Sequence, residues 1–146
     1  DSHKPQSIFA FLPTELKSGL PFLVNADFIL NASRESIQFD RKWNQWLRDC
    51  IAPVWIEAFK AALALEEHRM EAYSFIPFKN NNYDNFFEPI PEAIFAGISD
   101  SPVVWTFDGE FSKPGNVRLT DKKFRALIGE GKRPVQMKMT PLVHPT

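Results

Sequence analysis

The segment from Leu30 to Gln38 places one arginine at the mouth of a turn among hydrogen-bonding side chains. The guanidinium of Arg34 is always charged, and its planar fork of donors matches two phosphate oxygens at once. Ser33 is positioned to cap a short helical turn, whose free backbone N–H groups would point the same way as the arginine. Gln38 would add a neutral donor on the same side, and Asn31 projects just before the turn. These residues predict a site that contacts phosphate.

The residues before this turn indicate the element that positions it. Apolar residues recur at every second place from Phe22 to Leu30, which predicts a half-buried strand with one dry face. The inward side chains would be Phe22, Val24, Ala26, Phe28 and Leu30. A strand of this kind delivers the turn to a fixed point that is open to solvent, where charged ligands are usually met.

A surface ion pair is the alternative interpretation of Arg34. Its possible partners are Asp27, Glu35 and Asp40, and such a pair contributes only about 0–1 kcal/mol. The two interpretations predict different structures. A phosphate-contacting Arg34 would be exposed with no bidentate carboxylate partner, whereas a structural one would be buried against these acids.

The pattern Leu-Asn-x-Ser-Arg-Glu-x-x-Gln, which begins at Leu30, resembles a segment in the middle domain of the ninety-kilodalton heat-shock chaperones. The residues before it, from Phe9 to Thr14 and from Ser18 to Pro21, make the match look more like sacsin and the plant NO VEIN proteins. Those very large proteins carry chaperone-type (GHKL) ATPase modules. The resemblance is dense from Ile8 to Trp46 and weaker from Pro102 to Leu119.

The resemblance implies that the chain is the middle, or transducer, domain that follows a nucleotide-binding domain. Arg34 would reach the terminal phosphate of ATP bound in that preceding domain, with Gln38, Ser33 and Asn31 as further nucleotide-binding residues. Contact would form only when the domains close, which would couple hydrolysis to shape. ATP and magnesium would be bound only through the upstream domain, because this chain has no glycine-rich phosphate cradle and no magnesium-ligand signature.

The chain alone is therefore not expected to be an enzyme, although it would be part of an ATPase module. Its expected partners are the upstream domain of the same polypeptide and protein clients. The alternative function is a nucleotide-independent interaction or scaffolding domain of a large sacsin-like or NO VEIN-like protein, since a degenerate module can keep its fold without binding nucleotide.

Composition narrows the remaining classes of function. The 146 residues have a formal net charge of −1 and no cluster of Lys and Arg, which argues against nucleic-acid binding. His3, His68 and His144 are scattered, so no metal site is expected. The single cysteine, Cys50, excludes an internal disulfide, and its place on an apolar helical face predicts a small buried side chain in a reducing compartment.

The chain has no signal peptide and no long apolar run, so no membrane association is expected and the predicted location is intracellular, in the cytoplasm or nucleus. It begins at Asp1 without a methionine and is interpreted as a piece of a longer protein. The predicted fold class is α+β, a small, mostly antiparallel sheet packed against helices in a single domain, 1–146. Residues 8–68 would form a transducer-like strand-strand-helix core, and residues 69–146 an α/β continuation.

Two neighbouring antiparallel strands are expected first, one at Ile8–Leu12 that Pro13 stops and one at Phe22–Leu30, joined by a loop over Thr14–Leu20. Two helices follow, at 41–51 with Asp40 as N-cap and at 53–68. A single helix kinked at the proline between them is the alternative. The predicted buried stripe is Trp43, Trp46, Leu47, Cys50, Ile51, Val54, Trp55, Ala58, Ala61, Ala62 and Leu65. Exposed tryptophans would instead form a docking patch.

Shorter elements are expected in the second half of the chain. A helix is predicted over Pro91–Gly97 and a strand over Val103–Phe107 that ends in a tight turn at Asp108 and Gly109. Val117–Leu119 would pair nearby. A last helix would begin after Thr120, and residues 131–146 would be extended. The inward residues of the two helices would be Ile94, Phe95 and Ile98, and then Phe124, Leu127 and Ile128.

Overall fold

Helices and two small sheets make up the residues that the computed structural model describes, 7–77 and 82–117. This arrangement confirms the predicted α+β class. Contacts divide the chain into two units, Asp1–Phe95 and Ala96–Thr146. The first unit holds the long helix and the larger sheet, and the second holds a small hairpin.

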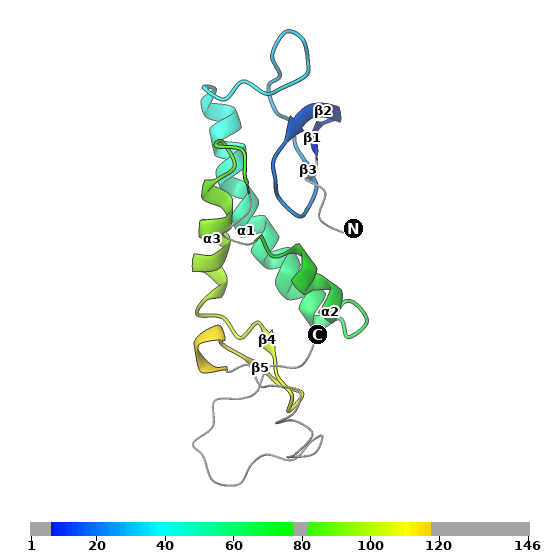
Figure 1. Ribbon diagram of the computed structural model, residues 1–146, viewed down its shortest axis with the longest axis vertical. Coiled ribbons are helices and arrows are strands. Elements are labelled where there is room, and N and C mark those ends of the chain that lie inside the picture. Colours follow the sequence, from blue (N-terminus) through cyan, green and yellow to red (C-terminus); the bar gives the residue numbers. More distant parts are fainter. Residues whose placement is uncertain (1–6, 78–81, 118–146) are drawn as a thin grey trace. The chain divides into compact units, whose positions relative to one another are not determined.

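The sheet of the first unit has three strands in the order β2-β1-β3 (Figure 1). The strands are β1 (Ser7–Ala10), β2 (Leu12–Lys17) and β3 (Val24–Asn25). β1 and β2 form an antiparallel hairpin, whereas β3 pairs with β1 in parallel, with Ile8 opposite Val24. The sheet is therefore mixed.

Two predictions about these strands are wrong. Pro13 does not stop the first strand; it lies within β2, an edge strand, where a residue without an N–H is tolerated. The chain reverses at Phe11, whose φ is 70°, so β2 occupies much of the predicted loop Thr14–Leu20. Because this extra strand reverses the chain direction, β3 runs parallel to β1 rather than antiparallel.

The alternating segment Phe22–Leu30 keeps its predicted faces but forms less strand than expected. Only Val24–Asn25 belongs to the sheet, and Leu30 makes an isolated antiparallel bridge with Ile37. Val24 and Phe28 are nevertheless buried, while the residues between them alternate toward solvent. The two-residue period identified the inward face correctly, because side-chain burial does not require a complete ladder of backbone hydrogen bonds.

A single helix, α1 (Lys42–Ala64), replaces the two predicted helices, as in the kinked-helix alternative. Pro53 lies inside it at an exposed position. The carbonyl that loses its helical donor belongs to Asp49, also exposed, and water can satisfy it. The predicted N-cap is off by one residue, because Arg41 occupies that position and makes no capping side-chain hydrogen bond.

The buried face of α1 differs from the predicted stripe. Its buried residues are Asn44, Ala52, Trp55, Phe59 and Leu63. Trp43 and Trp46 are instead 46% and 55% exposed, with ring centroids 5.1 Å apart. Cys50 is only half-buried. The prediction that Trp43 and Trp46 are buried was wrong. Tryptophan occurs both in cores and on half-exposed surfaces, so its presence alone does not identify the buried face of a helix.

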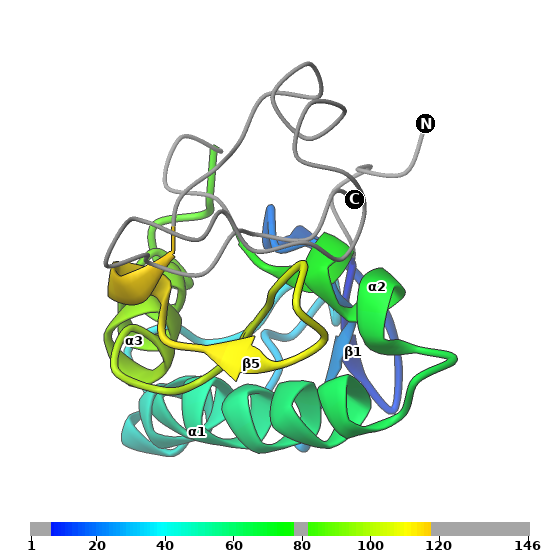
Figure 2. The same cartoon turned by 90° about the horizontal axis from the view of Figure 1, so that it is seen from below.

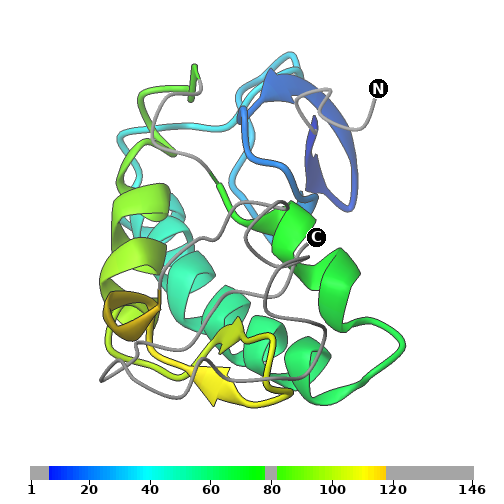
Figure 3. The same ribbon diagram turned by 60° about the horizontal axis from the view of Figure 1, so that its bottom comes forward.

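Shorter helices follow α1 along the chain. α2 (Arg69–Ala72) and the 3₁₀ turn η1 (Tyr73–Phe75) fold back beside the carboxyl-terminal end of α1 (Figure 3). α3 (Pro89–Ile98) begins two residues earlier than predicted, since a proline is well suited to a first helical turn. Ile94 and Ile98 are buried as expected, together with Ile90, whereas Phe95 is half-buried.

The second unit contains a two-stranded antiparallel hairpin of β4 (Val104–Trp105) and β5 (Phe111–Ser112), followed by the 3₁₀ turn η2 (Pro114–Asn116) (Figure 2). The predicted tight turn is present, and Gly109 adopts a φ of 77° that favours glycine. The strand pairs with β5, and the predicted nearby pairing of Val117–Leu119 extends into residues 118 and 119, which lie outside the described residues. So do the predicted helix after Thr120 and the extended segment 131–146.

Asn44 connects α1 to the two segments that flank the turn between Leu30 and Gln38, called the candidate turn below. Asn44 is fully buried, and both the oxygen and the nitrogen of its side-chain amide make hydrogen bonds. Oδ1 accepts a hydrogen bond from the N–H of Ile29 at 2.8 Å, and Nδ2 donates to the carbonyls of Ile29 at 2.9 Å and Gln38 at 2.8 Å. One side chain therefore holds the two strands that enter and leave the turn.

Replacing Asn44 with alanine should lower the free energy of unfolding by about 1–3 kcal/mol, because it removes three hydrogen bonds and leaves the N–H of Ile29 without its partner. Urea denaturation followed by circular dichroism measures this change. Asn85 is exposed and makes no hydrogen bond within the described ranges 7–77 and 82–117, so Asn85→Ala is the matched control. Equal losses in the two variants would contradict the role assigned to Asn44.

A salt bridge in the second unit makes a separate prediction. Lys113 Nζ lies 2.7 Å from Asp100 Oδ1, and this hydrogen bond, together with the lysine charge, lowers the pKa of the Asp100 carboxyl. Lys113→Gln should raise that pKa toward its ordinary value in a carbon-13 NMR titration. Since the folded pKa is lowered, the pair stabilises the fold above the ordinary carboxyl pKa and ceases to do so as pH falls through the lowered pKa. Lys60→Gln should leave the titration unchanged, and an unchanged pKa in Lys113→Gln would refute the assignment.

Candidate functional site

The candidate turn is an irregular hairpin closed at its base. Leu30 and Ile37 form its antiparallel bridge. The N–H of Asn31 donates to the Ser36 carbonyl at 2.9 Å, and the N–H of Gln38 donates to the Ile29 carbonyl at 2.9 Å. The backbone is therefore not helical here, and the expected helical cap at the start of the turn is wrong.

Asn31 and Ser33, two of the predicted nucleotide-binding residues, are bonded inside the turn. Asn31 Oδ1 accepts hydrogen bonds from Ser33 Oγ at 3.1 Å and from the N–H of Ser36 at 3.3 Å. Ser33 Oγ in turn accepts from the N–H of Glu35 at 3.4 Å. These short polar side chains replace backbone partners in the turn, as Asn and Ser commonly do. In this structure they shape the loop.

Gln38 braces the base of the same turn. Its Nε2 donates to the Leu30 carbonyl at 2.8 Å, and its Oε1 accepts from Arg41 Nε at 2.7 Å. Because the turn is a hairpin, Gln38 stands at its base while the arginine stands at its far end. Sequence reasoning missed Arg41 and Asn44 as supports. The sequence did offer a signal for Asn44. Asparagine is a poor helix former, so its presence in the first turn of a helix, on the buried face, indicates that its amide makes hydrogen bonds outside the helix.

Arg34 occupies the tip of the turn in the left-handed region, with a φ of 62°. Its N–H donates to the Asn31 carbonyl at 3.1 Å, and its side chain is exposed. Within the described part of the chain, the guanidinium forms no ion pair and no hydrogen bond. Asp27, Glu35 and Asp40, its possible carboxylate partners, are exposed and unpaired with it.

The left-handed conformation is costly for arginine. A residue with a Cβ loses about 1–2 kcal/mol there, and such positions usually carry glycine. A conformation of this kind persists only where the surroundings impose it, and it is often found at functional sites. The surroundings here are the brace at the base of the turn and a hydrogen bond from the N–H of Glu15, in β2, to the Glu35 carbonyl at 2.9 Å. The loop stands at the top of the view in Figure 1.

Other chemistry is sparse in residues 7–77 and 82–117. Those residues contain no group of three or more His, Cys, Asp or Glu side chains that could hold a metal ion. They also include no helix with the length and apolar character needed to cross a membrane. The exposed guanidinium of Arg34 is thus the feature of this region that best suits an external anion.

Comparisons with known proteins relate this chain to segments of very large plant and human proteins. It is 28% identical over 135 residues to Protein NO VEIN of Arabidopsis thaliana, covering 86% of this chain and 5% of that protein. It is 39% identical over 62 residues to sacsin of Homo sapiens, covering 37% of this chain and 1% of sacsin. No family model and no solved structure matches. The chain is therefore sacsin-like and NO VEIN-like, and it spans a small fraction of both relatives.

Arg34→Gly should raise the free energy of unfolding by about 0.5–1 kcal/mol, or leave it unchanged, because glycine relieves the left-handed strain while losing more conformational entropy on folding. Thermal and urea unfolding measure the effect. Arg34→Ala keeps the strain and should change stability by less than about 0.5 kcal/mol. A loss above about 1 kcal/mol in both variants would show that the guanidinium stabilises the fold, and would contradict its description as a free cation.

Proposed function

We propose that this chain is the middle, or transducer, domain of a chaperone-type ATPase module within a large NO VEIN-like or sacsin-like protein. Arg34 contacts the terminal phosphate of ATP bound in a preceding domain of the same polypeptide. The observation that carries the proposal is an exposed arginine, held in an unfavourable backbone conformation and without a carboxylate partner among the described residues. The similarity to the two large proteins and the Leu30–Gln38 pattern support it.

The proposed chemistry is electrostatic. Negative charge spreads over the oxygens of the phosphoryl group as its bond to the leaving oxygen breaks, and a guanidinium can donate to two of those oxygens together. A donor that is already held in position loses little free energy to reorganisation when that charge develops. In comparable ATPases and GTPases, such an arginine accelerates the reaction by about 10³–10⁵-fold.

The supports of the turn explain how contact at Arg34 would affect the rest of the domain. Asn44 connects the base of the turn to α1, and the Glu15–Glu35 hydrogen bond connects its tip to β2. Movement of the guanidinium toward a phosphate would therefore pull on a helix and a sheet and not on a free loop. Asn31, Ser33 and Gln38 act in this proposal as positioning residues, and any direct contact between them and nucleotide remains a prediction.

ATP and magnesium belong to the preceding domain in this proposal. The described residues offer the Arg34 guanidinium toward the phosphate and contain no group of three or more His, Cys, Asp or Glu side chains that could hold a metal ion. Protein clients are expected to bind elsewhere on the large polypeptide. In this proposal the domain therefore contributes to ATP hydrolysis only when it is joined to the preceding domain.

The second candidate is a nucleotide-independent interaction domain. It is favoured by the exposed pair of Trp43 and Trp46 on α1, since tryptophans with about half of their surface open to solvent are typical of protein contacts. The Nε1 of Trp43 donates to the Asp27 carbonyl at 2.8 Å, so this ring is fixed on the surface. A fixed aromatic surface suits a neighbouring domain or a separate partner.

The test uses a polypeptide that contains this chain and the domain preceding it. Arg34→Ala should lower ATP turnover about 100-fold or more while nucleotide affinity changes much less, because the contact strengthens in the transition state. Arg34→Lys should recover only part of the rate, since an ammonium is a point charge without the planar fork. Lys42→Ala removes an exposed positive charge at the start of α1 and should leave turnover unchanged.

Unchanged turnover in Arg34→Ala, or no turnover in the unmodified polypeptide, would favour the interaction domain. In that case Trp43→Ala and Trp46→Ala should abolish binding to the neighbouring domain while the fold is retained. The two readouts, ATP turnover and domain association, therefore separate the two candidates.

A further inference from the structure

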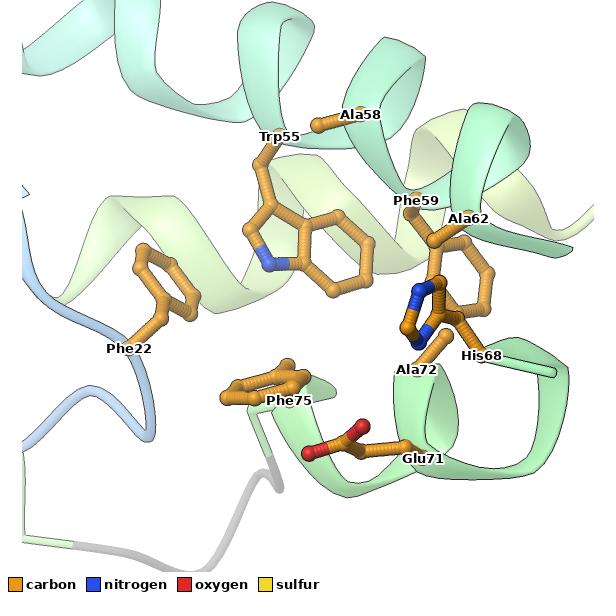
Figure 4. Close-up of a pocket in the computed structure, with 9 residues that line it drawn as sticks. All are labelled: Phe22, Trp55, Ala58, Phe59, Ala62, His68, Glu71, Ala72 and Phe75. Atoms are coloured by element: carbon orange, nitrogen blue, oxygen red, sulfur yellow. The ribbon is translucent and has the colours of Figure 1, made fainter. Parts of the chain in front are cut away.

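A cavity of about 430 Å³ opens beside the carboxyl-terminal half of α1 (Figure 4). Four aromatic rings contribute to its walls: Phe22, Trp55, Phe59 and Phe75. α1 supplies Trp55 and Phe59, η1 supplies Phe75, and the segment before β3 supplies Phe22. The volume lies within the range of sites that hold small molecules or single side chains.

The inner rings are fixed by packing. Trp55 and Phe59 are 9% and 4% exposed and stack with centroids 4.7 Å apart. Phe22 lies against Trp55 with centroids 6.0 Å apart, and Phe75 is 42% exposed at the opening. In Figure 4 the rings of Phe22, Trp55 and Phe75 stand around one space. Aromatic rings thus border this space on more than one side.

The polar groups of the cavity carry one negative charge that the described residues leave unbalanced. Glu71 lines the cavity and is exposed, and its carboxylate makes no ion pair or hydrogen bond with any residue in the described ranges. His68 also lines it, and its Nε2 lies 3.5 Å from a carboxylate oxygen of Glu67. An anion would meet the Glu71 charge, and a hydrated metal ion would have to lose water to apolar walls.

We propose that this cavity binds an organic cation, a methylated ammonium group carried on an apolar stem. The methyl groups would pack against Trp55 and Phe75, the ring faces would attract the positive charge, and Glu71 would balance it. An unmodified ammonium is strongly hydrated and would gain less from the same walls. The proposal is independent of the ATPase assignment, because none of these residues belongs to the Leu30–Gln38 turn.

Such a group has two sources, a methylated lysine of a partner protein or a free small cation. Isothermal titration of the whole 146-residue chain separates them with four probes. These are a short peptide with trimethyllysine, the same peptide with lysine, the same peptide with carbon in place of the quaternary nitrogen, and choline. The trimethyllysine peptide should bind about tenfold or more tightly than the lysine and carbon forms. Choline binding of similar strength assigns the free cation, and weaker choline binding assigns the peptide.

Two exposed residues test the walls without disturbing the core. Phe75→Leu keeps an apolar side chain but removes the ring and should weaken binding about fivefold. Glu71→Gln should weaken it about threefold to tenfold by removing the balancing charge. Glu66 is exposed and does not line the cavity, so Glu66→Gln should bind as the unmodified chain does. Melting curves check that every variant is folded.

The proposal is overturned if the carbon-substituted peptide binds as tightly as the trimethyllysine peptide, because the cavity would then respond to apolar surface alone. It is also overturned if no cationic probe binds at millimolar concentration, or if Phe75→Leu and Glu71→Gln both bind as the unmodified chain does.

Discussion

The hydrogen bonds of one buried amide determine where the candidate site lies. Asn44 accepts from the N–H of Ile29 and donates to the carbonyls of Ile29 and Gln38, so both sides of the turn are fixed to the first turns of α1. Without this amide the part-buried N–H of Ile29 would lose its partner, and the two carbonyls would keep only their bonds from the N–H groups of Gln38 and Arg41. The base of the turn is therefore fixed to α1, and the position of its tip depends on where α1 packs.

The backbone strain at the tip of the turn falls on a single residue, Arg34. Arg34 adopts a left-handed backbone conformation while its side chain has no partner among the described residues, so the fold gains little from having arginine there. Glycine or asparagine would suit the same backbone better. Strain without a compensating contact is what a residue retained for an external ligand would show. The proposed ATP contact would account for this combination, and the chain is similar to segments of two very large proteins, NO VEIN and sacsin.

Sequence reasoning was most successful where one local rule governs the structure. The two-residue period identified Val24 and Phe28 as inward, and the Asp-Gly pair identified the hairpin turn. It failed where the outcome depends on tertiary partners: Pro13 is accepted at a sheet edge, and Pro53 at a solvent-facing position of α1. Within the candidate site, the exposed guanidinium was predictable from its residue type and place. The internal use of Asn31, Ser33 and Gln38 was not, because a helical turn and a hairpin assign their side chains different neighbours.

The most direct test is a structure of a polypeptide that joins this chain to its preceding domain, with magnesium and a transition-state analogue of ATP bound. The account predicts that the guanidinium nitrogens of Arg34 lie about 2.7–2.9 Å from oxygens of the terminal phosphate or its mimic, with the turn itself unchanged. A closed, nucleotide-bound structure in which Arg34 faces solvent, or pairs with a carboxylate while another residue holds the terminal phosphate, would contradict it.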